Sequence, residues 1–152
     1  MFRVSRLLVV AVLTLAVARP ASASAIPAPL FTVAGVVNNG GLGTFVACTN
    51  GDAVPVTVGV EVFGPSGASL NNPTSTAVNV APQATVLFGT TPAGGLAVDI
   101  NLGIGNVEKG SAHILTTSKK IVCSPFLADF VNNPPTSMTR LTISAKGKEK
   151  GD

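Results

Sequence analysis

The sequence predicts an all-β fold, a single immunoglobulin-like β-sandwich of about 7–9 short strands. Short β-branched segments alternate with polar residues at a period of two, and turns rich in Gly, Pro and Asn separate these segments. Two cysteines lie far apart in the chain, each inside an apolar run. The chain has no Trp and no Tyr, so it lacks the core tryptophan and the tyrosine corner of true immunoglobulin domains. A closed barrel is the alternative that this pattern leaves open.

The N-terminus predicts a signal peptide over residues 1–25. Arg3 and Arg6 form a basic segment, residues 7–18 form an apolar run, and an Ala-x-Ala pattern ends at Ala25, with Ala23 as the alternative cleavage site. The apolar run is shorter than the roughly 20 residues that span a bilayer as a helix. We therefore expect a secreted or periplasmic (cell-envelope) protein with no membrane span in its mature form.

Removal of this leader changes the charge balance. The chain has 10 Lys and Arg residues, and three of them (Arg3, Arg6 and Arg19) precede the cleavage site, which leaves seven against 7 Asp and Glu residues. A nucleic-acid-binding protein needs a basic stripe that displaces counterions. A mature net charge near zero therefore argues against a nucleic-acid partner.

The clearest strand covers residues 54–63, where Val54, Val56, Val58, Val60 and Val62 share one face. Asn39-Gly40 predicts a type I′ hairpin turn within residues 38–41. The β-sandwich domain is expected over residues 26–145, and a polar tail without regular structure over residues 146–152. The remaining strands are predicted, in chain order, at residues 31–37, 44–49, 76–80, 85–90, 96–102, 111–117, 121–126 and 138–144.

Cys48 and Cys123 are predicted to form a disulfide. An exported protein folds in an oxidising compartment, where an even pair of cysteines normally closes into a cystine. We expect the bond to hold two strands together that are distant in sequence, as the inter-sheet disulfide of immunoglobulin domains does. Free thiols and a thiol metal site are the alternatives, although there is no Cys-x-x-Cys motif and only 1 His.

No catalytic motif is present in the sequence, so we expect no enzymatic activity, no cofactor and no metal. Two residues are the candidate ligand-binding side chains. His113 lies in a predicted strand and has no evident acidic partner in sequence. Asp129 lies between apolar residues, where a carboxylate costs free energy unless it is paired or exposed.

Three segments carry a resemblance to known proteins: "FVACTNGDAVPVTVGVEVFGPSG", "APQATVLFGTT" and "GSAHILTTSKKIVCSPFLAD". Together they resemble a group of short exported bacterial β-sandwich proteins of unknown function. Their strand order from Thr44 to Asp129 is also similar to the β-sandwich of sensory-rhodopsin-transducer-like proteins. The resemblance implies the fold and the compartment, and it brings no site residue with it.

These observations lead to two expectations for function. The first is a non-catalytic exported binding or accessory module for an unknown protein or small-molecule partner. The alternative is a structural subunit of a surface assembly, fimbria-like, which self-assembles by adding strands to exposed edges.

Overall fold

The described part of the chain folds into ten strands and one helical turn. The computed structural model describes residues 28–93 and 95–146; the predicted leader and residues 147–152 of the predicted tail lie outside these ranges. The all-β sandwich fold is confirmed. No helix in the described part of the chain is long and apolar enough to cross a membrane. The elements are β1 (Ala28–Asn39), β2 (Leu42–Asn50), β3 (Val56–Phe63), α1 (Pro73–Thr76), β4 (Val78–Val80), β5 (Thr85–Gly89), β6 (Ile100–Asn101), β7 (Val107–Thr116), β8 (Ile121–Asp129), β9 (Met138–Arg140) and β10 (Ile143–Ala145).

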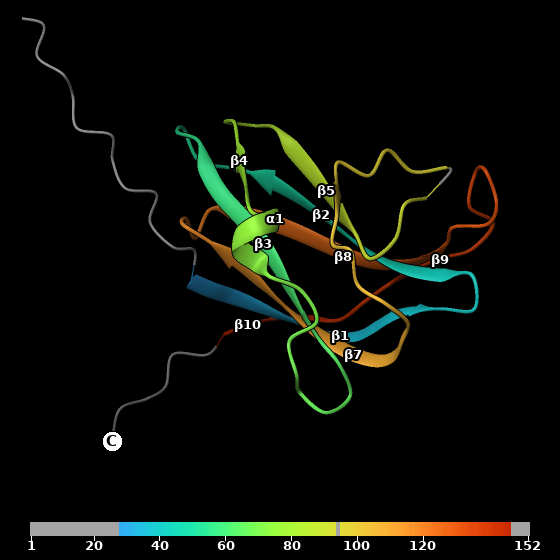
Figure 1. The fold of residues 1–152 in the computed structure, drawn as a ribbon. Helices are drawn as coiled ribbons and strands as arrows, with labels where there is room; N and C mark the ends of the chain where they lie inside the picture. The colour runs from blue at the N-terminus through green and yellow to red at the C-terminus, as the bar shows by residue number, and fades with distance from the viewer. Residues whose placement is uncertain (1–27, 94, 147–152) are drawn as a thin grey trace, which may run out of the picture.

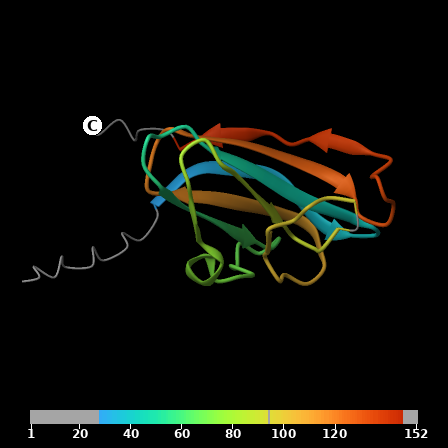
Figure 2. The ribbon, with the colours of Figure 1, turned by 90° about the horizontal axis from the view of Figure 1, so that it is seen from above.

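The strands form two layers that share one continuous ladder. Sheet I has the order β4-β3-β7-β1-β10 and sheet II the order β9-β8-β2-β5-β6 (Figure 1). Every pair is antiparallel except β5 with β6. The β1–β2 hairpin passes from one sheet to the other at one end of the molecule. Figure 2 shows β9 and β10 along one side of the molecule, while α1 lies on the opposite side.

The β1–β2 turn confirms the predicted hairpin, with its centre one residue later. Asn39 pairs with Leu42, so Gly40 and Gly41 are the two turn residues. Both have positive φ, 60° and 82°, as a type I′ turn requires. The side chain of Thr44 then reinforces the corner, because its Oγ1 accepts a hydrogen bond from Val37 N and donates one to Val37 O.

The core is built mainly from valine on alternate strand positions. Val56, Val58, Val60 and Val62 are at most 3% exposed, as their shared face predicts. Val54 lies before the strand and is 58% exposed, so the predicted first position of that face is wrong. Pro55 separates it from β3, and a proline has no N–H to donate to a sheet ladder.

Two of the predicted strands differ in the structure. Within residues 96–102 only β6 is a strand, and Asp99 lies before it with both its backbone N and a side-chain oxygen bonded to Leu87 of β5. Within residues 138–144 the chain crosses between the sheets at Leu141 and Thr142. Leu141 N donates to Pro125 O in sheet II, and Ala34 N of sheet I donates to Thr142 O. A single predicted strand therefore becomes β9 and β10.

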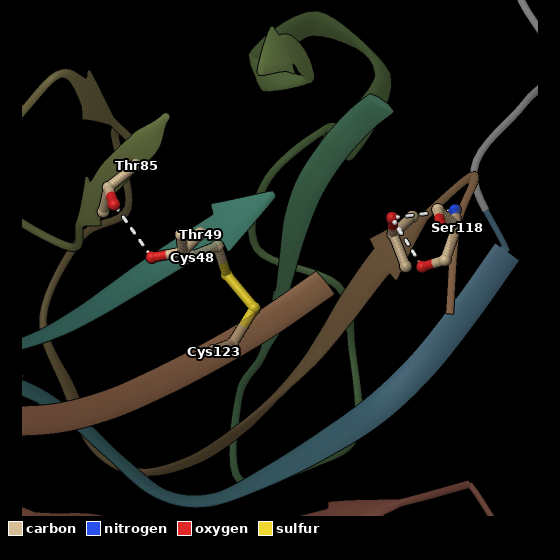
Figure 3. Close-up of a disulfide and its surroundings, with 6 residues drawn as sticks. Cys48, Thr49, Thr85, Ser118 and Cys123 are labelled. Atoms are coloured by element: carbon tan, nitrogen blue, oxygen red, sulfur yellow. Dashed lines mark hydrogen bonds between the residues drawn. A yellow bond between two sulfur atoms is a disulfide. The ribbon is translucent and has the colours of Figure 1, made fainter. Parts of the chain in front are cut away.

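The Cys48–Cys123 disulfide is present, but it joins neighbouring strands rather than the two sheets (Figure 3). Cys48 on β2 lies directly opposite Cys123 on β8, with their Cα atoms 4.1 Å apart. This is the close spacing of a non-hydrogen-bonded antiparallel pair. The predicted disulfide between two strands distant in sequence is confirmed, but because β8 and β2 are adjacent in sheet II it is not the inter-sheet bond of immunoglobulin domains. Both cysteines face the core, at 0% and 7% exposed.

Asn50, at the end of β2, is a buried polar residue that connects the two sheets. Its side chain is 0% exposed and has partners for its donors and its acceptor. The Nδ2 group donates to Val54 O and to Val80 O of β4, both at 2.9 Å, while Oδ1 accepts from Asp52 N at 2.7 Å. The end of sheet II is thereby attached to the edge strand of sheet I through satisfied hydrogen bonds.

Removal of the disulfide by the double substitution Cys48→Ala and Cys123→Ala is expected to lower the free energy of unfolding by about 2–4 kcal/mol. The bond closes a loop between residues 75 apart in sequence, for which the chain-entropy model allows up to about 4.5 kcal/mol. Urea unfolding of the oxidised protein and of the double variant measures this difference. A reductant is expected to destabilise the parent protein and to leave the variant unchanged. A decrease in the free energy of unfolding of less than about 1 kcal/mol would contradict the stabilising role that we assign to the disulfide.

Candidate binding face around His113

His113 lies on the outer face of sheet I, in the middle of β7. The strand register places Glu61 of β3 on one side of it and Thr32 of β1 on the other. Directly opposed residues in an antiparallel pair have Cβ atoms roughly 4.5–5.5 Å apart and share one face. The acidic neighbour that is not evident from the local sequence is therefore Glu61, which is brought to His113 by the β3–β7 pairing.

Phe63 adds an aromatic surface beside the imidazole ring. The two ring centroids lie 4.8 Å apart with an interplanar angle of 67°, an edge-to-face arrangement. Phe63 and His113 are both half-buried, so each ring keeps an exposed part. Ser111, opposite Phe63 in the register, continues the same face toward the beginning of β7.

An open groove of about 510 Å³ adjoins this face. It lies where β3 ends and its chain turns away, since Gly64 N donates to Ala68 O and Gly67 N donates to Gly64 O. Ser111 belongs to both the groove and the His113 face. The groove is lined by Gly35, Gly64, Pro65, Glu108, Lys109, Gly110 and Ser111.

Gly35 shapes one side of the groove through its backbone. Its φ is 79°, a conformation that residues with a Cβ rarely adopt. The β1–β7 register shifts between Ala34 and Val36, so Gly35 is the extra residue of a β-bulge. The bulge bends β1 beside the groove, and bulges commonly lie next to functional sites.

The groove carries one charge of each sign. Glu108 Oε1 accepts a hydrogen bond from Asn39 Nδ2 at 3.2 Å, which ties this acid to the β1–β2 hairpin. Lys109 is exposed, and the ion pair between Lys120 and Asp52 is the one that the described residues form. Lys109 is therefore the cation that the groove offers to a ligand.

Asp129, the second candidate from sequence, lies at the end of β8, opposite Leu42 beside the β1–β2 hairpin, and organises its own loop. It is 7% exposed, and its carboxylate accepts hydrogen bonds from the backbone N–H and the side chain of three residues: Asn132, Thr136 and Ser137. Burial by itself raises the pKa of the Asp129 carboxyl group. The hydrogen bonds from Ser137, Thr136 and Asn132 outweigh burial and hold this pKa far below its usual range.

The structure therefore does not bring the two sequence candidates together. It surrounds His113 instead with Glu61, Phe63 and the groove, which sequence reasoning missed as a site. The alternation of residues 54–63 already places Glu61 and Phe63 on the face opposite the valines. The local pattern does not show which strand pairs with them, because that strand, β7, lies about 50 positions later in the chain. The described residues contain no group of three or more His, Cys, Asp or Glu side chains arranged to hold a metal ion.

Comparisons of this chain with protein-family models, with curated proteins and with solved structures find no match. The choice of a site therefore depends on the geometry of the chain itself.

The substitution Asp129→Asn is expected to remove a pH-dependent part of the stability. A carboxyl group whose pKa is lowered on folding stabilises the protein above its unfolded pKa, about 3.9, and this contribution is lost as the pH falls below that value. The parent protein should unfold at higher urea concentration than the variant at pH 6, and the difference should shrink below about pH 3.9. Urea midpoints between about pH 2.5 and 7 measure this. A difference that stays constant over the whole range would contradict the role of the carboxylate.

Proposed function

We propose that this chain is a non-catalytic exported binding module, whose ligand-binding surface is the His113 face together with the adjoining groove. The observation that carries the proposal is the convergence on one face of a histidine, an acid, an aromatic ring and an open groove. Binding sites commonly combine a concave surface with a few convergent polar groups. Here the strands β1, β3 and β7 position all of these groups on a rigid sheet.

The opposite outer face, on sheet II, supports this choice because the chain covers part of it. Phe45 points away from the main core, yet it is 0% exposed. Its ring stacks on Phe126 at a centroid distance of 5.5 Å and lies close to Gly89. Gly89 in turn lies against Thr91 and Val98 of the segment before β6. This segment occupies on sheet II the position that a ligand would take on sheet I.

A binding role without catalysis is supported by the contacts of the two sequence candidates. His113 packs against the Phe63 ring, and the Asp129 carboxylate is occupied by its own loop. A general base has to reach the proton that it abstracts. Export is supported by the leader pattern and by the disulfide, since cystines persist in oxidising compartments.

Two observations weigh against the fimbria-like alternative. The N-terminal strand β1 lies inside sheet I, between β7 and β10, where it cannot be donated to a neighbour without dismantling the sheet. The edge of β3 is occupied by Asn71, whose side-chain amide pairs with Val62 N and Val60 O like a short strand.

Photocrosslinking tests the proposed face. We place a photoreactive amino acid at Ser111, on the proposed face, and in a matched variant at Thr49, a half-buried strand position on the outer face of sheet II. Each variant is expressed in the native host and recovered from its envelope or medium. We expect a discrete adduct from the Ser111 variant only, on a protein that begins near Ile26.

Adducts from the Thr49 variant alone, or none from either variant, would contradict the proposed face. A recovered protein that keeps its first 25 residues would contradict export. The mass of the recovered chain shows whether the leader has been removed, independently of which variant forms an adduct.

A further inference from the structure

Strand β7 continues beyond the end of its neighbour β3. The last pair between the two strands is Phe63 with Ser111, whereas β7 begins four residues earlier, at Val107. On its other side, the same part of β7 still pairs with β1, through Gly110 with Val36 and Val107 with Asn38. One side of this part of β7 is therefore paired, and its other side faces the groove.

The side of β7 that faces the groove has no strand partner in the described chain. Residues 107–110 precede the last pair with β3. The β1–β7 register shifts between the pairs Val36–Gly110 and Asn38–Val107, so β7 is irregular at Glu108 and Lys109. Within residues 28–93 and 95–146, no hydrogen bond to the main chain of Lys109 comes from that side.

Two other strand edges of the described chain are closed by its own groups. Asn71 imitates a strand along β3, and Asp99 does so along β5, where it bonds to both Leu87 N and Leu87 O. An unpaired main-chain donor and acceptor beside a groove are what β-strand addition uses, because the added strand contributes main-chain hydrogen bonds. Residues 107–110 of β7 combine a strand side without a partner with an adjoining groove.

We propose that the groove binds a short extended segment of a partner polypeptide, which pairs with residues 107–110 of β7 in line with β3 and carries an acidic side chain. This inference rests on the proposed function and specifies the ligand class of the same site. The acidic side chain follows from the charges of the groove, since Glu108 is held by Asn39 and Lys109 remains to be complemented. The open stretch, residues 107–110, corresponds to a strand of roughly 13 Å.

A second copy of this chain fits the groove less well than a separate partner. The C-terminal end of the described chain follows β10, which runs antiparallel to β1. Lys146 N bonds to Leu30 O, so the chain leaves toward the Ala28 end of β1, away from Gly35 and the groove. The described edge strands that another copy could offer, β4 and β10, are each three residues long and already paired on one side.

The test uses the oxidised protein and a library of N-acetylated, C-amidated hexapeptides with a fixed central Glu and Val or Thr at alternate positions. The tightest binder is added to the ¹⁵N-labelled protein. We expect shifts of the amide signals of residues 107–111, and the exchange of at least one amide proton within residues 107–110 should slow by about tenfold or more, because it gains a hydrogen-bond partner.

Two matched controls separate main-chain pairing from charge. N-methylation of the peptide nitrogen that faces residues 107–110 of β7 should weaken binding by about tenfold, the equivalent of one lost hydrogen bond. The substitution Lys109→Glu should weaken binding by about two- to fivefold, as for an exposed ion pair. A peptide with Lys in place of Glu should regain that loss on the variant.

Several outcomes would overturn the inference: no library member binds, the N-methylated peptide binds equally well, or the shifts fall on residues 121–124 or on β6. The photocrosslinking experiment tests the binding face independently of these peptide-binding outcomes. An adduct at Ser111 with a glycan or another non-peptide molecule would retain the binding face and reject the polypeptide ligand. Failure of both experiments would reject the binding face as well.

Discussion

The pairing of β2 with β8 is the constraint on which the rest of the fold depends. The nine residues of β2 are each paired with a residue of β8, and the Cys48–Cys123 bond excludes any other register. A slip by one residue would move every side chain to the other face of the sheet. The fixed register directs Cys48 into the core and Phe45 to the outside. Asn50, at the end of the same strand, then attaches β4 of the opposite sheet.

This constraint makes the two outer faces of the sandwich unequal. Because Phe45 points outward from sheet II, the chain has to cover it, and Phe126 together with the segment before β6 does so. The corresponding face of sheet I carries Glu61, His113 and Thr32, which can remain in contact with water. Burial of a large aromatic ring removes apolar surface from water at a gain of about 25 cal/mol per Å². On sheet I the aromatic ring of the same kind of face, Phe63, packs against His113 and stays half-buried, so this face keeps an exposed part.

The local sequence pattern was sufficient to predict most of the strands, but it was not sufficient to predict the candidate binding face. The alternation in residues 54–63 and the Asn-Gly-Gly turn encode β3 and the first hairpin, because both depend on neighbouring residues alone. The division of residues 138–144 into β9 and β10 depends on acceptors in two different sheets. The disulfide partners could be inferred because only two cysteines exist, whereas their adjacency in one sheet required the topology. Glu61 and His113 meet for the same reason, through a register between positions 52 residues apart, 61 and 113.

The closure of strand edges leads from the fold to the binding chemistry. An exposed edge invites pairing with other chains, and natural sheets block edges with side chains, bulges or short strands. Asn71 and Asp99 block two edges by placing a polar side chain where a peptide group would lie. At Lys109 the chain does the opposite: β3 turns away at Gly64, Gly35 bends β1, and no described side chain takes the place of the missing strand. A strand side that is left open beside a groove is the geometry that β-strand addition by a partner polypeptide uses.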